Sequence, residues 1–182
     1  MQLNRVVTVA ALAVGGVMLS KQLKKNRSWG GPSEVTESIE VNVPLHTAYN
    51  QWTQFEDFPK FMKSVHEVRQ IDNRHLHWRA NIAGEEKEWN AEITEQIPDK
   101  RIAWRSTSGV HNAGVVTFHR IADNSTRVTL QMEYEPQNMA EKVVDVLGAV
   151  RMEARSNLEN FKKMLEQRGQ ETGAWRGTVA QH

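Results

Sequence analysis

The 182-residue chain contains no cysteine, which excludes disulfide scaffolds, zinc sites ligated by cysteine and cysteine nucleophiles. It also has almost no net charge, since 23 basic and 22 acidic residues give +1 at pH 7. This balance hides an uneven distribution, because all charged residues within residues 1–30 are basic. The rest of the chain is therefore acidic, which disfavours nucleic-acid binding. A mean hydropathy of −0.60 excludes a polytopic membrane protein, and 39% hydrophobic residues exclude a fully disordered one.

One uncharged apolar run interrupts this polar composition, at residues 6–19. As a helix it would span about 21 Å, short of the roughly 30 Å hydrocarbon core, unless Arg5 and Lys21 reach the interfaces. A membrane anchor, a cleaved signal peptide and a soluble or interfacial helix all fit this pattern. We expect residues 1–25 to anchor the chain, with residues 6–19 contacting the membrane.

The charges that flank this run predict its orientation. Basic residues are more numerous after the run than before it, so the positive-inside rule places the following domain in the cytoplasm, at the cytoplasmic membrane. The alternative is a secreted or periplasmic protein, because Ala11-Leu12-Ala13 matches a signal-peptidase motif. Residues 26–36 are polar and rich in glycine and serine, and we expect a linker there.

The segment after the linker predicts a strand and then two short helices. Residues 37–43 alternate in hydropathy, as a strand does. Pro44 suits the first turn of a helix that would run to about Trp52. Aromatic residues then recur every third position and are interrupted by Pro59, which predicts two helical pieces joined at a bend.

From residue 65 to residue 136 the hydrophobic period changes to two. Short alternating segments are separated by turn residues such as Asp72-Asn73, Ala83-Gly84 and Asp123-Asn124. This pattern predicts an antiparallel meander with one buried and one solvated face. The expected strands are residues 65–71, 75–82, 88–93, 101–105, 115–121 and 127–134.

A long amphipathic helix is predicted at the C-terminal end. Asn138 and Glu141 resemble a capping box, and Gly169 fits a helix stop. Between them, apolar residues step by three or four positions over about seven turns. We expect a flexible tail at residues 169–182, which are polar and contain glycine.

The order of these elements, together with four segments, resembles a known superfamily. The segments are Ile39 to Leu45, Trp52 to Met62, Trp89 to Trp104 and Gly114 to Phe118. They resemble the START-like, Bet v-type superfamily, and in particular its polyketide cyclase/dehydrase and coenzyme Q-binding group. The resemblance implies an α+β helix-grip domain at residues 37–168. Its curved antiparallel sheet of about seven strands, two short helices and long C-terminal helix would enclose a cavity.

Hydrophobic alternation selects the residues that would line such a cavity. The inward set fits an apolar binding cavity and equally fits a filled core. Its members are Trp78, Trp89, Trp104, Phe118, Met132, Tyr134, Leu147, Val150 and Ala154.

The signals for catalysis or metal binding are weaker. His75 and His77 share a strand face, but alternation places that face outward, so we expect no metal site. Tyr134 and Arg120 are the best-placed candidate acid or base groups by parity, yet neither has an evident partner, and we assign no catalytic residue and no cofactor.

Three functions are consistent with these observations. The first is a membrane-tethered module that binds a hydrophobic small molecule such as a quinone or lipid. The second is an enzyme that cyclises or dehydrates a polyketide-like substrate. The third is a structural or stress-related envelope protein without a ligand. The absence of a phosphate-binding loop and of a recognisable catalytic arrangement favours a binding module over an enzyme. The acidic domain disfavours nucleic acid, and we expect no nucleic-acid partner.

Overall fold

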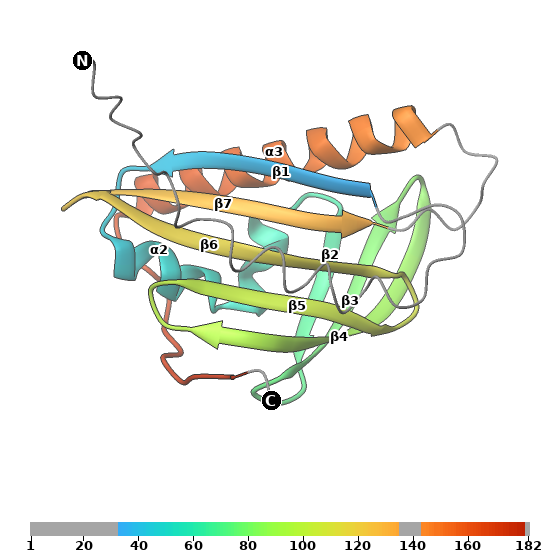
Figure 1. The fold of residues 1–182 in the computed structure, drawn as a ribbon, viewed down its shortest axis with the longest axis horizontal. Coiled ribbons are helices and arrows are strands. Elements are labelled where there is room, and N and C mark those ends of the chain that lie inside the picture. The colour runs from blue at the N-terminus through green and yellow to red at the C-terminus, as the bar shows by residue number, and fades with distance from the viewer. Residues whose placement is uncertain (1–32, 135–142, 181–182) are drawn as a thin grey trace, which may run out of the picture. The chain divides into compact units, whose positions relative to one another are not determined.

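The computed structural model describes residues 33–134 and 143–180 (Figure 1). One seven-stranded antiparallel sheet, in the order β1-β7-β6-β5-β4-β3-β2, curves around the domain interior. Its strands are β1 (Ser33–Val41), β2 (Val65–Gln70), β3 (His75–Ile82), β4 (Glu85–Ile97), β5 (Arg101–Ser108), β6 (Asn112–Ala122) and β7 (Ser125–Tyr134). This is the helix-grip architecture that the sequence predicted.

Some sequence predictions concern residues outside the described ranges. These are the anchor and most of the linker before residue 33, and the capping residues Asn138 and Glu141. Across the described residues, we find no helix with the length and apolar character needed to cross a membrane. The first strand starts at Ser33, inside the segment expected to be linker, because Val35 pairs with Met132 and is buried.

The strands extend the expected meander, and register shifts interrupt their pairing at four places, one of which changes the buried face of β4. The β3–β4 hairpin closes at Ala83-Gly84, where both residues have positive φ. The β4–β5 register shifts between Ile93 and Glu95, so that Gln96, instead of Glu95, continues the buried face of β4. A bulge inserts one residue and inverts the alternation beyond it, which parity alone could not anticipate.

Two short helical segments pack under one end of the sheet, as predicted, but the break between them lies at residues 53–54 and not at Pro59. Pro44 precedes α2 (Leu45–Trp52), and the 3₁₀ helix η2 (Phe55–Lys60) contains Pro59. Trp52 lies at the centre of their aromatic contacts, with ring centroids 5.6 Å from Phe58 and 4.9 Å from Phe161. Proline and the three-residue spacing favour the tighter 3₁₀ geometry in the second piece.

The long helix α3 (Val143–Arg168) runs alongside β1 in the same direction (Figure 1). Arg151 lies 3.6 Å from Glu37 in the middle of β1, and Glu166 accepts the Asn42 backbone N–H at 2.7 Å beyond its end. The buried stripe of the helix is Ala154, Leu158, Phe161 and Leu165. Gly169, with a φ of +73°, ends the helix as expected.

The prediction of a flexible tail from residue 169 was wrong for residues 171–179, which pack on the domain. The Thr172 backbone N–H donates to Gln51 Oε1 at 2.9 Å, and Val179 exchanges two backbone hydrogen bonds with Gln96 at 2.8 and 2.9 Å. Gln51 and Gln96 are fully buried polar residues. The polar tail therefore supplies hydrogen-bond partners that these buried groups require.

Candidate functional site on the inner face of the sheet

The interior has two ends that differ in how completely they are filled. At the first, which we call the filled end, aromatic rings from α2, η2, β6 and α3 contact one another. Tyr49, Trp52 and Phe118 illustrate this, with ring centroids 5.5 Å apart for Tyr49 and Phe118 and 6.3 Å apart for Trp52 and Phe118. All three side chains are buried. This end is an ordinary hydrophobic core.

Tyr49 is the ionisable group of the filled end. Its hydroxyl accepts a hydrogen bond from Gln96 Nε2 at 3.1 Å, and the Arg176 guanidinium lies 5.6 Å from its ring centroid. Burial raises the pKa of Tyr49 above its ordinary value, despite the opposing effects of the Gln96 hydrogen bond and Arg176. The phenol therefore remains protonated at neutral pH and acts as a structural contact between α2, β4 and the C-terminal segment.

Other apolar side chains of the inner face are only partly buried, and we call the region that they form, which adjoins the filled end where Trp78 contacts Phe58, the open end. Trp78, Trp104 and Met132 come from β3, β5 and β7, and Leu147 and Val150 come from the first half of α3. The ion pair between Arg151 and Glu37 holds this half of α3 beside the middle of β1. Half-buried apolar side chains retain surface that a hydrophobic partner could cover.

Trp104 has a defined position at the open end because its neighbour is glycine. Gly114 stands directly opposite it on β6, and a Cβ at position 114 would lie 2.5 Å from the indole ring. The indole N–H donates to Asn112 Oδ1 at 3.3 Å. The absence of a side chain at Gly114 thus allows the Trp104 ring to lie across the neighbouring strand.

Trp78 differs from Trp104 because its indole N–H has no hydrogen-bond partner. Its ring stacks on Trp89 with centroids 5.6 Å apart and planes 11° apart, and contacts Phe58 at 5.6 Å. The indole Nε1 is buried and has no hydrogen-bond partner. A buried N–H without an acceptor is unfavourable by about 1–3 kcal/mol, so this atom marks a position where an acceptor would be stabilised.

The structure divides the nine sequence-selected lining residues among several environments. Five line the open end, namely Trp78, Trp104, Met132, Leu147 and Val150. Trp89 is buried against Trp78, Ala154 is buried in the α3 stripe, and Phe118 belongs to the filled end. The side chain of Tyr134 lies outside the described set. Alternation thus identified the inner face but could not tell its two ends apart.

Two residues of the open end escaped the sequence analysis. Asn112 holds the Trp104 indole, and Val110, in the β5–β6 loop, packs against the core. Neither belongs to an alternating segment, so hydrophobic periodicity gave no signal for them. A glycine at position 114 leaves space on β6, and this is the feature that could have predicted that the Trp104 ring lies across that strand.

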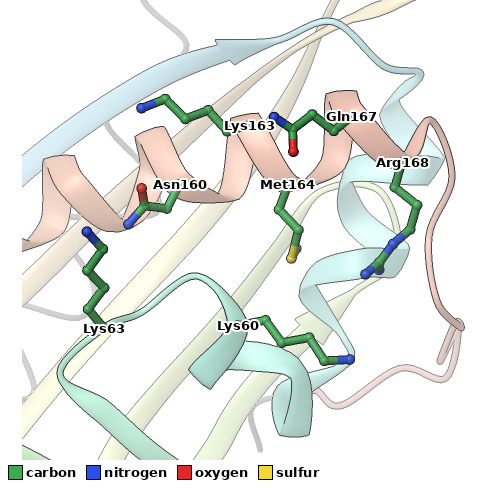
Figure 2. A pocket seen from close by; sticks show the side chains of 7 residues that line it. All are labelled: Lys60, Lys63, Asn160, Lys163, Met164, Gln167 and Arg168. Carbon is green, nitrogen blue, oxygen red and sulfur yellow. The ribbon is translucent and has the colours of Figure 1, made fainter.

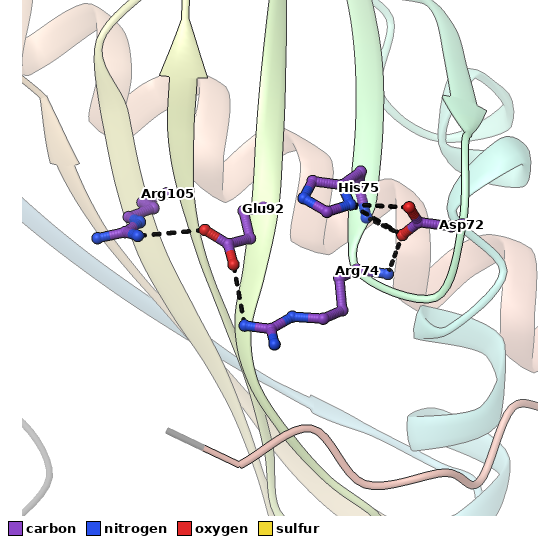
Figure 3. Close-up of polar contacts among 5 residues, drawn as sticks. All are labelled: Asp72, Arg74, His75, Glu92 and Arg105. Atoms are coloured by element: carbon purple, nitrogen blue, oxygen red, sulfur yellow. Dashed lines mark hydrogen bonds and ion pairs between the residues drawn. The ribbon is translucent and has the colours of Figure 1, made fainter. Parts of the chain in front are cut away.

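The outer face of the sheet carries a charged network that includes His75 (Figure 3). His75 Nδ1 lies 2.8 Å from Asp72 Oδ2, and Glu92 bridges Arg74 and Arg105 at 2.9 and 3.2 Å. Hydrogen bonds from the backbone N–H of Arg74 and from His75 lower the pKa of Asp72. No group of three potential metal ligands occurs in the described part of the chain.

One candidate catalytic residue does not reach the interior. Arg120 has the inward parity, but it lies near the end of β6, where its side chain is exposed and pairs with Asp123 in the following turn. The register of β6 shifts directly after Arg120, which ends the regular alternation of the strand there. Arg120 is therefore a surface residue.

Comparisons with known proteins identify related chains and folds. The family model described as polyketide cyclase/dehydrase and lipid transport matches residues 41–163. An uncharacterised 17.2 kDa protein of Streptomyces lincolnensis is 55% identical over 148 residues, which cover 81% of this chain and 99% of that protein.

Solved structures share the fold at low sequence identity. The Zhui aromatase/cyclase of Streptomyces sp. R1128 has a TM-score of 0.66 at 14% identity, covering 79% of this chain and 99% of the other. A START superfamily protein of Mycobacterium smegmatis has a TM-score of 0.61 at 17% identity, covering 76% of this chain and 97% of the other. At such identities the likeness concerns the fold alone.

Proposed function

The chain belongs to the polyketide cyclase/dehydrase and lipid transport family, and from this premise we propose that its open end binds a hydrophobic small molecule. The observation that carries the proposal is the contrast between the two ends of one interior. Aromatic side chains close the filled end, whereas Trp78, Trp104 and Met132 remain partly accessible at the other. A ligand that covers them would gain about 25 cal/mol for each Å² of apolar surface removed from water.

The ligand would carry a hydrogen-bond acceptor. The buried Trp78 Nε1 lacks a partner, while the Trp104 indole already donates to Asn112. A carbonyl oxygen placed at Trp78 would remove the penalty of an unsatisfied donor. Quinones and esterified lipids both combine an extended apolar body with carbonyl oxygens, and they are the ligand classes that we propose.

Membrane tethering belongs to the same proposal. The uncharged run at residues 6–19 would anchor the chain, and the basic residues that follow it would hold the domain on the cytoplasmic side. An anchored binding module would exchange its ligand with the adjoining bilayer. Sedimentation of the full-length chain with membranes after lysis tests this part, and an uncleaved chain in the soluble fraction would contradict it.

A matched pair of ligands tests the binding function. We would titrate full-length protein with 2-methyl-1,4-naphthoquinone and with 2-methylnaphthalene, which share a ring system but differ in their carbonyl oxygens. Equilibrium dialysis gives both affinities, and the absence of cysteine removes thiol addition as a side reaction. One hydrogen bond is worth about 0.5–1.5 kcal/mol, so the quinone should bind about 2- to 12-fold more tightly.

Two tryptophan variants make the test specific. Trp78→Phe keeps an aromatic ring but lacks the N–H, and it should abolish the preference for the quinone. Trp175→Phe changes an indole in the C-terminal segment and should leave the preference intact. Failure of both ligands to bind the wild type would refute the proposed function for this ligand class. Mass spectrometry of the recovered quinone reports whether the protein converts it.

A further inference from the structure

A second concave site lies outside the interior, between the C-terminal half of α3 and the segment that follows η2 (Figure 2). The pocket has a volume of about 540 Å³. None of the side chains that line it is acidic. They are Lys60, Lys63, Asn160, Lys163, Met164, Gln167 and Arg168.

The cations of this pocket are unusual for this domain. Within residues 33–134 and 143–180, most lysines and arginines have a carboxylate within ion-pair distance. In these ranges, the lysines and arginines without a carboxylate at that distance are Lys63, Arg69, Lys100, Lys163 and Arg168. Three of these exceptions line the same pocket. The local positive charge is therefore not neutralised by the protein.

The walls of the pocket are held together by direct contacts. Asn160 Nδ2 donates to the Phe61 carbonyl oxygen at 3.1 Å, which connects α3 to the loop between η2 and β2. Lys60 is bound to Asp57 at 2.6 Å. Figure 2 shows Lys63 reaching toward Asn160, whereas Met164 and Arg168 project from α3 toward η2 and Lys163 extends at the edge. The cationic groups thus come from two elements fixed against each other.

The helix dipole explains only part of this arrangement. Cations near a helix C-terminus are stabilised by the dipole, which accounts for Arg168 in the last turn of α3. It does not account for Lys63, which lies on a separate loop across the pocket. Lys63 and Arg168 bring like charges to one pocket from two elements, and a bound anion would offset their repulsion.

We propose that this pocket binds the phosphate group of an anionic ligand. A phosphate presents several strong acceptor oxygens, and the pocket offers cationic donors at both of its ends, namely the ammonium group of Lys63 and the guanidinium group of Arg168, which also donates to Gln51 Oε1 at 3.5 Å. Met164 supplies an apolar surface beside them for the part of the ligand that carries the phosphate. The phosphate could belong to a soluble ester or to a lipid headgroup, since the recognition chemistry is the same.

Calorimetric titration of full-length protein distinguishes these two sources. The probes are glycerol 3-phosphate and dihexanoyl phosphatidic acid, the latter below its micelle-forming concentration. Dihexanoyl phosphatidylcholine serves as the zwitterionic comparison. We expect saturable binding of at least one of the first two, weakened by added salt. Binding of both identifies a soluble ester as sufficient, and binding of the phosphatidic acid alone identifies a lipid headgroup.

Arg69 and Lys100, which also lack a paired carboxylate but lie outside the pocket, provide a matched control for mutation. The double variant Lys63→Ala/Arg168→Ala should weaken binding at least tenfold. Arg69→Ala/Lys100→Ala removes the same residue types and charge from outside the pocket, and its affinity should stay within twofold of the wild type. Lys63→Gln alone alters one exposed loop side chain, so it tests the site even if the double variant unfolds. Equal losses in the pocket and control variants, or no saturable binding of either phosphate probe, would overturn the proposal.

Discussion

Gly114 and Trp104 stand opposite each other on β6 and β5, and substituting the glycine tests the architecture of the open end. In Gly114→Ala the new methyl group would lie 2.5 Å from the Trp104 ring and 2.8 Å from the Gln131 carbonyl oxygen. Both separations are well inside van der Waals contact, so the indole must turn away and the strand pairing must adjust. Overpacking of this kind destabilises a protein by about 1–3 kcal/mol.

The Trp104 ring accounts for part of this penalty, which a double-mutant cycle isolates. Trp104→Ala alone should destabilise by about 2–3 kcal/mol, less than the 3–5 kcal/mol typical of a fully buried tryptophan, because the side chain is only partly buried. In the Trp104→Ala background the Gly114→Ala methyl meets only the carbonyl oxygen. The second substitution should then be less harmful by about 1 kcal/mol or more.

Urea unfolding followed by far-ultraviolet circular dichroism measures these free energies without relying on tryptophan fluorescence. Arg105→Ala, at an exposed neighbouring position paired with Glu92 at 3.2 Å, is the control and should change stability by no more than about 1 kcal/mol. If the effects of the Gly114 and Trp104 substitutions add within about 0.5 kcal/mol, the indole does not lie on Gly114 and our account of the open end fails.

Three further predictions concern other parts of the domain. Ala154→Leu adds volume at a buried position of α3 and should destabilise by about 1–3 kcal/mol in thermal or urea unfolding; an unchanged stability would mean that space exists beside it. Burial and the neighbouring Glu34 raise the pKa of Glu133, so the charged form of this side chain is disfavoured in the folded state. Glu133→Gln should therefore increase the free energy of unfolding at pH 7. This gain should disappear as the pH falls below 4.5, the ordinary pKa of a glutamate. Truncation after Gly169 should destabilise by more than about 2 kcal/mol, because Gln51 and Gln96 lose several hydrogen bonds, whereas a truly flexible tail would leave stability unchanged.

Hydrophobic period was sufficient to predict most of the fold because each element has one buried face. The alternation in residues 75–82 correctly placed Leu76 and Ala80 inside and His75 outside. The predicted strand ended at Ile93, whereas β4 continues to Ile97, and a bulge inverts its alternation beyond Ile93 and brings Gln96 inside. A bulge depends on the fit between neighbouring strands, and no local pattern in the sequence marks it.

The C-terminal segment shows a second reason why sequence reasoning fell short. Its composition is polar, which by itself favours solvation. The structure nevertheless attaches it through Thr172 and Val179 to polar groups buried elsewhere in the domain. Such long-range complementarity becomes visible only when Gln51 and Gln96 are known to be buried without sufficient local partners.

The sequence predicted which face of the sheet bears the candidate site, but not where on that face the site lies. Trp104 and Phe118 have the same inward parity, yet the first is only partly buried at the open end and the second lies among the aromatic rings of the filled end. Which end is filled depends on where α2 and η2 pack, because their aromatic side chains occupy the interior there. That placement is a tertiary feature which the strand sequences do not contain.

The geometry of α3 makes the two proposed sites separable by experiment. Its first half contributes Leu147 and Val150 to the open end, and its second half contributes Met164 and Arg168 to the cationic pocket. Between them the buried stripe, represented by Leu158, packs the helix against the domain. Substitutions at sites this far apart normally act additively. Lys63→Gln should therefore leave the preference for the quinone unchanged, and Trp78→Phe should leave phosphate binding unchanged; a loss of both activities in either variant would instead indicate that the two sites are coupled through α3.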